Sequence, residues 1–332
     1  MGRHLRLFGM DFPPLIALLA EAARLFGDSL LALRFTPALA HAALVLLAGL
    51  LAREFGGGRF AQLLAALPVA LTPLFLRAGN LFQPVVFDQL WWTLTLLLLA
   101  RLGRHGFPAA SRGWLPFRAV GWACLVSFVV IMLLRGKPYY AGPLFPTLFA
   151  AGAVVLQRLS DGWRERGHAA APRVLRGGAV GLVLVFGALI LPLGLPLPQD
   201  YADMLGWPAQ AAAVARAYHS LSPAERRETV LIGTNYGRAG ALDFFGPRHG
   251  LPPAVAPVGS YWFSGPCEKP GRVLLVLGGT RAELQPYCRH LTQAGRVAER
   301  WAVPEEQAVS IWLCRRPYHT LQALWPRWEG QN

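Results

Sequence analysis

Two cations and two tyrosines are crowded into one short stretch, LLRGKPYYAGPLFP (133–146), between two long apolar runs. Arg135 and Lys137 can hold a phosphate group by charge-assisted hydrogen bonds. Tyr139 and Tyr140 can add hydroxyl contacts or stack on a sugar ring. Lys137 is one of two lysines among 32 basic residues, which makes it a chemical choice worth testing. The ordinary alternative is that the cations snorkel to lipid headgroups and the tyrosines belong to an interfacial aromatic belt.

Two carboxylates stand out in this apolar chain. Asp11, in GMDFPP, directly precedes a Pro-Pro helix start, where it can bind a divalent metal ion, a cationic sugar or an acceptor, or simply cap the helix. Asp88, in LFQPVVFDQLWW, lies about one turn inside an apolar run, and a carboxylate at membrane depth is a candidate for function. Asp88 has two structural alternatives, which are to cap the helix after Pro84 or to pair with Arg77.

Two glycine-containing segments follow predicted strands in the C-terminal part, GTNYGRAGALDFFGPRHGLP (233–252) and VLGGTRAEL (276–284). Both are weak nucleotide-loop signals, because they lack G-x-G-x-x-G and a P-loop lysine. The first is better interpreted as strand, turn and helix, with Asn235 and Tyr236 at the end of the strand. No Ser-His-Asp or Cys-His signature and no metal-ligand spacing of Cys and His is evident. We therefore expect no cofactor, apart from a divalent metal ion that an acidic residue at the outer surface can hold.

The composition indicates an integral membrane protein with a soluble part. Of the 332 residues, 54% are hydrophobic and 15% charged, and the mean hydropathy is +0.37, whereas soluble domains carry about 25% charged residues. The net charge of +14 suggests nucleic acid at first. However, the arginines cluster at the ends of apolar runs, where the positive-inside rule places them. We therefore expect membrane lipids and no nucleic acid as partners.

Membrane-spanning helices need about 20 mostly apolar residues. Six segments qualify, at 35–53, 60–77, 84–101, 117–135, 140–157 and 175–195. Before them, 14–27 predicts an amphipathic interfacial helix in which Glu21 and Arg24 share one face. Trp91 and Trp92 suit an aromatic belt at the membrane interface.

The loops predict the orientation of the chain. The first, third and fifth connections between the spans are richer in arginine and should be cytoplasmic, so the even connections face outward. The N-terminal segment and the C-terminal domain then lie on the outer face of a bacterial inner membrane. The domains expected are an outer-face amphipathic segment at 1–34, a membrane domain at 35–196 and a periplasmic domain at 197–332.

The C-terminal domain should be a small α/β domain. Residues 208–227 predict a helix and a turn, and short buried strands are expected at 229–234, 272–279 and 309–314. TRAELQPYCRHL (280–291) reads as a helix capped by Thr280. If the domain is exported, one disulfide among Cys267, Cys288 and Cys314 would leave one thiol free, and the sequence leaves the pairing open.

The stretch DFPPLIALLAEAARLFGDSLLALRFTPALAHAALVLLAGLLAREFGGGRFAQLLAAL resembles the early part of bacterial family 39 glycosyltransferases, which include protein mannosyltransferases and lipid A aminoarabinose transferases. The marks are acid-x-Pro-Pro-Leu, Phe-Gly-Asp-Ser, Leu-x-x-Arg-Phe and Ala-Arg-Glu-x-Gly-Gly. LFQPVVFDQLWW and RGKPYYAGPLFPTLFAAGAVVL resemble later segments, and TNYGRAGALDFFGPRHGLPPAV and SYWFSGP resemble the family's periplasmic tail. The similarity touches most of the chain.

The resemblance implies a C-type membrane fold and an inverting transferase that moves a sugar from a polyprenyl-phosphate donor to a lipid or cell-envelope acceptor. It implies that Asp11 and Asp88 line the acceptor side and that Arg135 and Lys137 bind the donor phosphate. The two tyrosines, Tyr139 and Tyr140, would shape the pocket. The chemistry agrees, because cations stabilise charge that develops on a leaving phosphate and an acceptor hydroxyl needs a base within hydrogen-bond reach.

Two departures from the family pattern predict a shortened chain. The family has a first span and an outer Asp-Glu loop upstream of acid-x-Pro-Pro, and several more spans where this chain has RLGRHGFPAASRGWLP (101–116). Phe12 also stands where the aminoarabinose transferases have Lys. The competing expectation is therefore a catalytically degenerate or accessory protein that binds polyprenyl lipid without turnover. A transporter is the third possible function. It would need polar or broken helices at the membrane midplane, and the predicted spans contain few such features.

Overall fold

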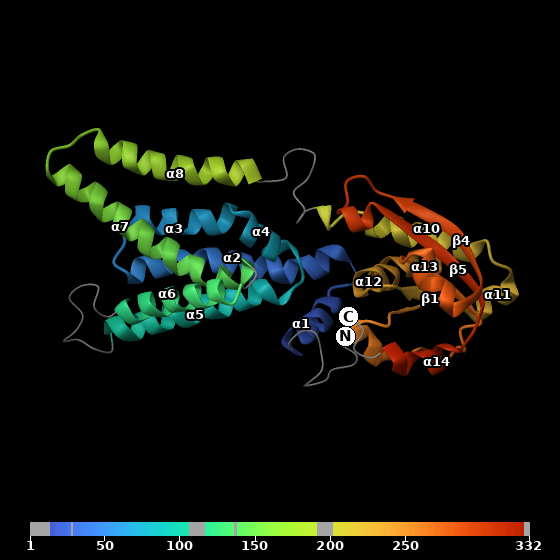
Figure 1. The fold of residues 1–332 in the computed structure, drawn as a ribbon. Helices are drawn as coiled ribbons and strands as arrows, with labels where there is room; N and C mark the ends of the chain where they lie inside the picture. Colours follow the sequence, from blue (N-terminus) through green and yellow to red (C-terminus); the bar gives the residue numbers. More distant parts are fainter. Residues whose placement is uncertain (1–13, 28, 106–116, 136–137, 191–201, 329–332) are drawn as a thin grey trace. The chain divides into compact units, whose positions relative to one another are not determined.

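The computed structural model describes residues 14–27, 29–105, 117–135, 138–190 and 202–328 (Figure 1). It divides the chain into two compact units, which are described separately below. The helical unit is Leu18–Leu193, and the second unit combines Met1–Ala17 with Gly194–Asn332. The division falls within the first helix, α1 (Pro14–Arg24). Glu21 and Arg24, predicted to share one face of this helix, form an ion pair at 3.4 Å.

The helical unit has the apolar helices of a membrane protein. After α1 come α2 (Leu30–Glu54), α3 (Arg59–Leu71), α4 (Pro73–Asn80), α5 (Pro84–His105), α6 (Arg118–Leu133), the 3₁₀ segment η3 (Pro138–Leu144), α7 (Phe145–Glu165) and α8 (Ala171–Ile190). Within the described residues, four helical stretches are long and apolar enough to cross a membrane. They are Leu30–Glu54, Pro84–Gly103, Tyr140–Glu165 and Ala171–Ala188.

The second predicted span is broken. Helices α3 and α4 meet at an angle of 60° and count as a fifth span if the pair crosses the membrane together. The cause is local: Thr72 precedes Pro73, and a residue before proline is pushed out of the helical region. Thr72 accordingly has an extended backbone with ψ 142°, and Pro73 occupies the first position of α4.

The span predicted at 117–135 forms a helix that is shorter than expected. Helix α6 has 16 residues and falls short of the length that a membrane span needs. It ends at Leu133, and Arg135 then takes the left-handed conformation with φ 51°. A left-handed residue just past a helix terminates the hydrogen-bonded ladder, so α6 does not continue into the connection that follows.

Contacts from α7 hold the turn between α2 and α3. Gln157 accepts hydrogen bonds from the backbone N–H groups of Gly58 and Ala61, both at 3.0 Å, and so satisfies the free end of α3. Arg158 donates to the carbonyl of Phe55 at the end of α2. Arginines of the neighbouring helix ends also pair here, Arg101 with Glu54 at 3.0 Å and Arg176 with Asp161 at 2.5 Å. Arginine-rich ends thus gather on one side of the helical unit.

The α/β unit contains a five-stranded sheet in the order β2-β1-β3-β5-β4, with β1 parallel to β2 and β3 and the other pairs antiparallel. Its strands are β1 (Thr229–Gly233), β2 (Ala254–Val255), β3 (Val273–Leu277), β4 (Cys288–Ala298) and β5 (Ala308–Pro317). Its helices are α10 (Trp207–His219), α11 (Pro223–Glu228), α12 (Tyr236–Phe245), α13 (Arg281–Leu284) and α14 (Leu321–Leu324), and its longer 3₁₀ segments are η4 (Gly246–His249), η5 (Gly259–Ser264) and η8 (Trp325–Trp328). The three predicted strands are confirmed as β1, β3 and β5.

The helix predicted over 280–291 is mostly wrong. Thr280 does cap a helix, and its side chain accepts from the N–H of Glu283, but α13 ends at Leu284. Pro286 then prevents a regular helix from continuing, because proline has no N–H group to donate. From Cys288 the chain forms β4, which pairs with β5 along its length. The partner strand lies about 20 residues later in the sequence, so local pattern cannot reveal this pairing.

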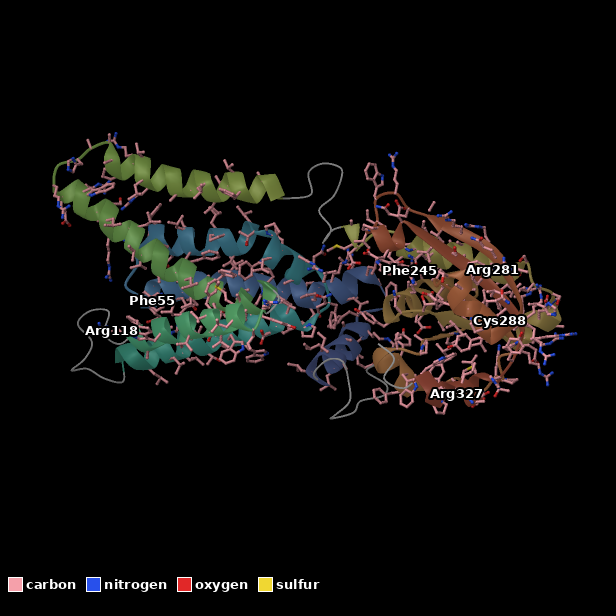
Figure 2. The ribbon with its side chains drawn as sticks, viewed as in Figure 1. Phe55, Arg118, Phe245, Arg281, Cys288 and Arg327 are labelled. Atoms are coloured by element: carbon pink, nitrogen blue, oxygen red, sulfur yellow. A yellow bond between two sulfur atoms is a disulfide. The ribbon has the colours of Figure 1, made fainter. Side chains whose placement is uncertain are left out.

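One disulfide joins Cys288 at the start of β4 to Cys314 in β5 (Figure 2). Both residues are buried, whereas Cys267 is free and exposed. The pairing that the sequence left open is thus Cys288–Cys314. The second lysine, Lys269, donates to the carbonyl of Thr229 at 3.2 Å and so helps to hold this unit together.

The sheet has two apolar faces, because successive side chains of a strand point to opposite sides. One face carries Leu231, Leu275 and Ile311 and is covered by α10 and α12, with Val214 and Leu242 in the same cluster. The other face packs against α13, α14 and η8 and carries Ile232, Leu274, Val276, Trp312 and Cys314. The second face is therefore covered by short segments.

Glu225 links α11 to the sheet. Its carboxylate accepts a 2.7 Å hydrogen bond from Arg315 and hydrogen bonds from the backbone and hydroxyl of Ser222. The Arg315 bond first, and the Ser222 bonds after it, lower the pKa of Glu225 from 4.5 to about 2. Because the folded state favours the carboxylate, this pair stabilises the fold only while Glu225 is ionised.

We expect Glu225→Gln to lower the thermal stability of the α/β unit at neutral pH and to have little effect near pH 2. A folded pKa below the unfolded one means that the contribution is present above about pH 4.5 and is lost as the pH falls towards 2. Since both side chains are partly exposed, the difference should stay within about 1 kcal/mol. Thermal unfolding of the parent chain and of Glu225→Gln at neutral pH and near pH 2 checks this prediction. An equal difference in stability at the two pH values would contradict it.

Candidate functional site

A pocket of about 380 Å³ lies between α5, α6 and η3 in the helical unit. Asp88, Trp92 and Leu96 form one wall, because residues four apart share a face of a helix. Helix α6 forms another wall, which includes Cys124, Ser127 and Ile131. The segment η3 completes the lining with Tyr140, Pro143 and Leu144. The walls are mainly apolar and carry one carboxylate and a few hydroxyl groups.

The segment η3 fits tightly against α5. A Cβ atom on Gly142 would lie 2.5 Å from the side-chain nitrogen of Gln89, so a residue larger than glycine requires the glutamine to move. Prolines at 138 and 143 favour a tight 3₁₀ turn over an α-helix at this point, because they remove backbone donors. This turn brings Tyr140 to the pocket that contains Asp88.

Asp88 lies beyond the first turn of α5, so it does not cap the helix. Its carboxylate accepts a hydrogen bond from the side chain of Trp92, one turn further along. The indole N–H therefore orients the carboxylate within the pocket. Trp92 was predicted to belong to an aromatic belt, and its i, i+4 spacing from Asp88 was the signal that could have revealed this second role.

The structure brings together two of the six residues predicted for the site, Asp88 and Tyr140. Arg135 is exposed on the connection between α6 and η3, outside the residues that line the pocket. Asp11, Lys137 and the side chain of Tyr139 lie outside the described part of the chain, so their roles stay predictions.

Arg135 occupies an unusual backbone position. Its φ of 51° is left-handed, and at the end of a helix glycine is the common residue in this conformation. A left-handed conformation costs an L-residue about 1 kcal/mol or more. The chain thus keeps an arginine where helix termination favours glycine, which is consistent with a use for its side chain.

Three buried polar side chains of the helical unit were missed by the sequence analysis. Gln89 and Thr93 of α5 and Thr147 of α7 are almost fully buried, and their polar side-chain atoms have no hydrogen-bond partner. A buried polar group without a partner costs stability. Gln89 and Thr93 share the face of α5 next to the one that carries Asp88, so the surroundings of the pocket are more polar than the apolar sequence suggests.

Among the residues that the structure describes, no three His, Cys, Asp or Glu side chains gather to hold a metal ion. Asp11, for which a metal ion was considered, lies outside the described residues. Comparisons with known protein families, curated proteins and solved structures find no match to this chain.

Proposed function

We propose that the helical unit is a membrane glycosyltransferase that moves a sugar from a polyprenyl-phosphate donor to a lipid or cell-envelope acceptor. The observation that carries the proposal is the pocket that Asp88 and Tyr140 line together. Asp88 accepts a hydrogen bond from Trp92, and Tyr140 belongs to the turn that follows Arg135 and Lys137 in the sequence. The resemblance to family 39 glycosyltransferases supplies the chemistry that this arrangement can perform.

In the proposed reaction, Asp88 accepts the proton of the acceptor hydroxyl, whose oxygen attacks the anomeric carbon of the sugar. The bond from that carbon to the lipid phosphate breaks, and the phosphate leaves with the bonding electron pair. Arg135 and Lys137 stabilise the charge that develops on the phosphate. Tyr140 shapes the pocket, and the hydrogen bond from Trp92 keeps the carboxylate oriented for proton transfer.

The same proposal assigns the protein to the bacterial inner membrane, with the α/β unit in the periplasm. The disulfide Cys288–Cys314 supports this placement, because disulfides form and persist in oxidising compartments such as the periplasm. The gathering of arginine-rich helix ends supports a cytoplasmic side for the odd connections.

The donor half of the proposal is tested with Arg135→Gly and Lys137→Ala in the full chain, reconstituted in phospholipid nanodiscs. Arg135→Gly removes the cation without adding backbone strain. The relief of the left-handed conformation and the extra freedom of glycine in the unfolded chain are each worth about 1 kcal/mol and oppose each other. We expect thermal stability to stay nearly constant while binding of a fluorescent polyprenyl phosphate weakens about tenfold or more in each variant.

Arg316→Gly is the matched control. Arg316 is also an exposed arginine with a left-handed backbone, φ 54°, but it lies in the α/β unit. Its replacement should leave polyprenyl-phosphate binding unchanged. Undiminished binding in both Arg135→Gly and Lys137→Ala would refute the assignment of the donor phosphate. Tight binding with no sugar transfer from any polyprenyl-linked donor would favour the accessory, non-catalytic protein.

A further inference from the structure

A second pocket, of about 490 Å³, lies in the α/β unit at the carboxyl ends of β1 and β3. Thr234 and Arg238 reach it from the segment after β1, and Gly279 and Glu283 from the segment after β3. These are the two glycine-containing segments that the sequence marked as weak nucleotide loops. The fold brings both to one place, and the helical unit contributes no residue to the lining.

The topology favours a ligand site at this edge. The connection from β1 leads through α12 to β2 on one side of β1, and α12 packs on the face that carries Leu231. On the other side β3 pairs with β1, and the helix that follows β3 contributes Leu284 to the opposite face. Connections that depart to opposite faces leave a crevice at the carboxyl ends of the strands, where open α/β sheets bind ligands.

Among the described residues that line the pocket, the one cationic side chain, Arg238, is not available to bind a phosphate. The guanidinium of Arg238 already has partners within the protein. It pairs with the buried carboxylate of Glu306 at 2.9 Å and donates a hydrogen bond to Thr234 at 2.8 Å. Thr234 in turn donates to the carbonyl of Leu277. Gly278 has φ +96°, and a Cβ there would overlap Thr234 and Arg238, so the loops are packed against each other. A nucleotide is therefore a poor fit.

The interior of the pocket is apolar. Ile232, Leu274 and Val276 form its floor on the thinly covered face of the sheet. Leu284 and Leu324 add aliphatic walls from α13 and α14. Two aromatic side chains, Tyr287 and Trp328, meet edge to face at 5.9 Å and line the same space. A sugar ring would leave its hydroxyl groups against these hydrocarbon walls without partners, whereas a hydrocarbon chain would not.

We propose that this pocket binds the hydrocarbon chain of a membrane amphiphile, with the polar end of the ligand at the rim beside Glu283 and Tyr287. The volume lies within the range of sites that enclose small-molecule ligands. A membrane can supply such a ligand, because within the described residues four helices of the same chain are long and apolar enough to cross one. The inference does not depend on glycosyl transfer.

The test uses the full chain in phospholipid nanodiscs with a monoacylglycerol, an uncharged amphiphile without a phosphate, that carries a photoreactive diazirine at the end of its acyl chain. After illumination, reduction and trypsin digestion, we expect label on the peptides that cover 282–289 and 316–327, which contain Leu284, Tyr287 and Leu324. Excess unlabelled monoacylglycerol should remove this label. The membrane helices contact lipid in any case, so labelling there is not counted.

Leu284→Trp fills the pocket with a larger side chain and should reduce labelling of both peptides to the level of an unilluminated sample. Leu205→Trp is the matched control, because Leu205 is half-buried in the same unit but does not line the pocket. If Leu284→Trp fails to form the Cys288–Cys314 disulfide, Val258→Trp replaces it from another wall. Three results would overturn the proposal: no label on either peptide, label unchanged in the folded filled variant, or label displaced by a free sugar and not by monoacylglycerol.

Discussion

Asp88→Asn should lower the rate of sugar transfer by roughly 10²–10⁴-fold, the usual contribution of a positioned general base. The amide keeps the size of the carboxylate and the hydrogen bond from Trp92, but it cannot take a proton from the acceptor hydroxyl. Binding of polyprenyl phosphate should stay within about twofold, because Asp88 acts on the acceptor side. The measurement is a single-turnover transfer assay with the reconstituted chain.

Asp161→Asn provides the matched control for this substitution. Asp161 pairs with Arg176 in the helical unit but does not line the pocket. Its replacement should leave the transfer rate unchanged and reduce stability by no more than about 1 kcal/mol, as expected for a partly exposed ion pair. Equal loss of transfer in both variants would mean that the effect is general, and an active Asp88→Asn would remove this residue from the mechanism.

Removal of the disulfide should destabilise the α/β unit by about 2–4 kcal/mol. The double variant Cys288→Ala, Cys314→Ala breaks a covalent link that joins β4 to β5 across a sequence separation of 26 residues. Alanine avoids placing a polar hydroxyl in this buried position. Pulse proteolysis in increasing urea, following the fragment that contains the α/β unit, measures the change without assuming that the whole chain unfolds in one step.

Cys267→Ala controls for the loss of a thiol, since Cys267 is exposed and free, and it should shift the urea midpoint little. A reductant should shift the parent chain towards the double variant and leave the double variant itself unchanged. If the reductant has no effect on the parent and the double variant is equally stable, the disulfide does not contribute to the stability of this unit.

Much of the fold can be predicted from local sequence. The apolar runs at 229–233 and 273–277 are too short for helices and rich in β-branched and aliphatic residues, and both form buried strands. Thr280 was expected to cap a helix and accepts a hydrogen bond from the third N–H of α13. Asn235, expected at the end of a strand before a turn and helix, does the same for α12. These features depend on residues a few positions apart, so the sequence contains the physical information needed.

The predictions that the structure corrects concern features that depend on residues far apart in the sequence or on where a helix ends. Strand β4 has a mixed exposed and buried pattern, and it exists because β5 and the disulfide hold it in place. Helix α6 is shorter than the segment predicted as a span, and a left-handed residue follows its end. Apolar content predicts that a segment avoids water, but it does not say where the hydrogen-bonded ladder stops.

For the candidate sites too, some properties follow from the sequence and others only from the tertiary structure. The sequence determined which residues carry unusual chemistry, since a carboxylate in an apolar run and cations between two such runs are costly unless they are used. The tertiary structure decided which of them meet. Asp88 and Tyr140 line one pocket because η3 turns back against α5, and the two glycine segments of the α/β unit converge because β1 and β3 are parallel neighbours. Such proximity depends on packing between segments about 50 residues apart, which no local pattern records.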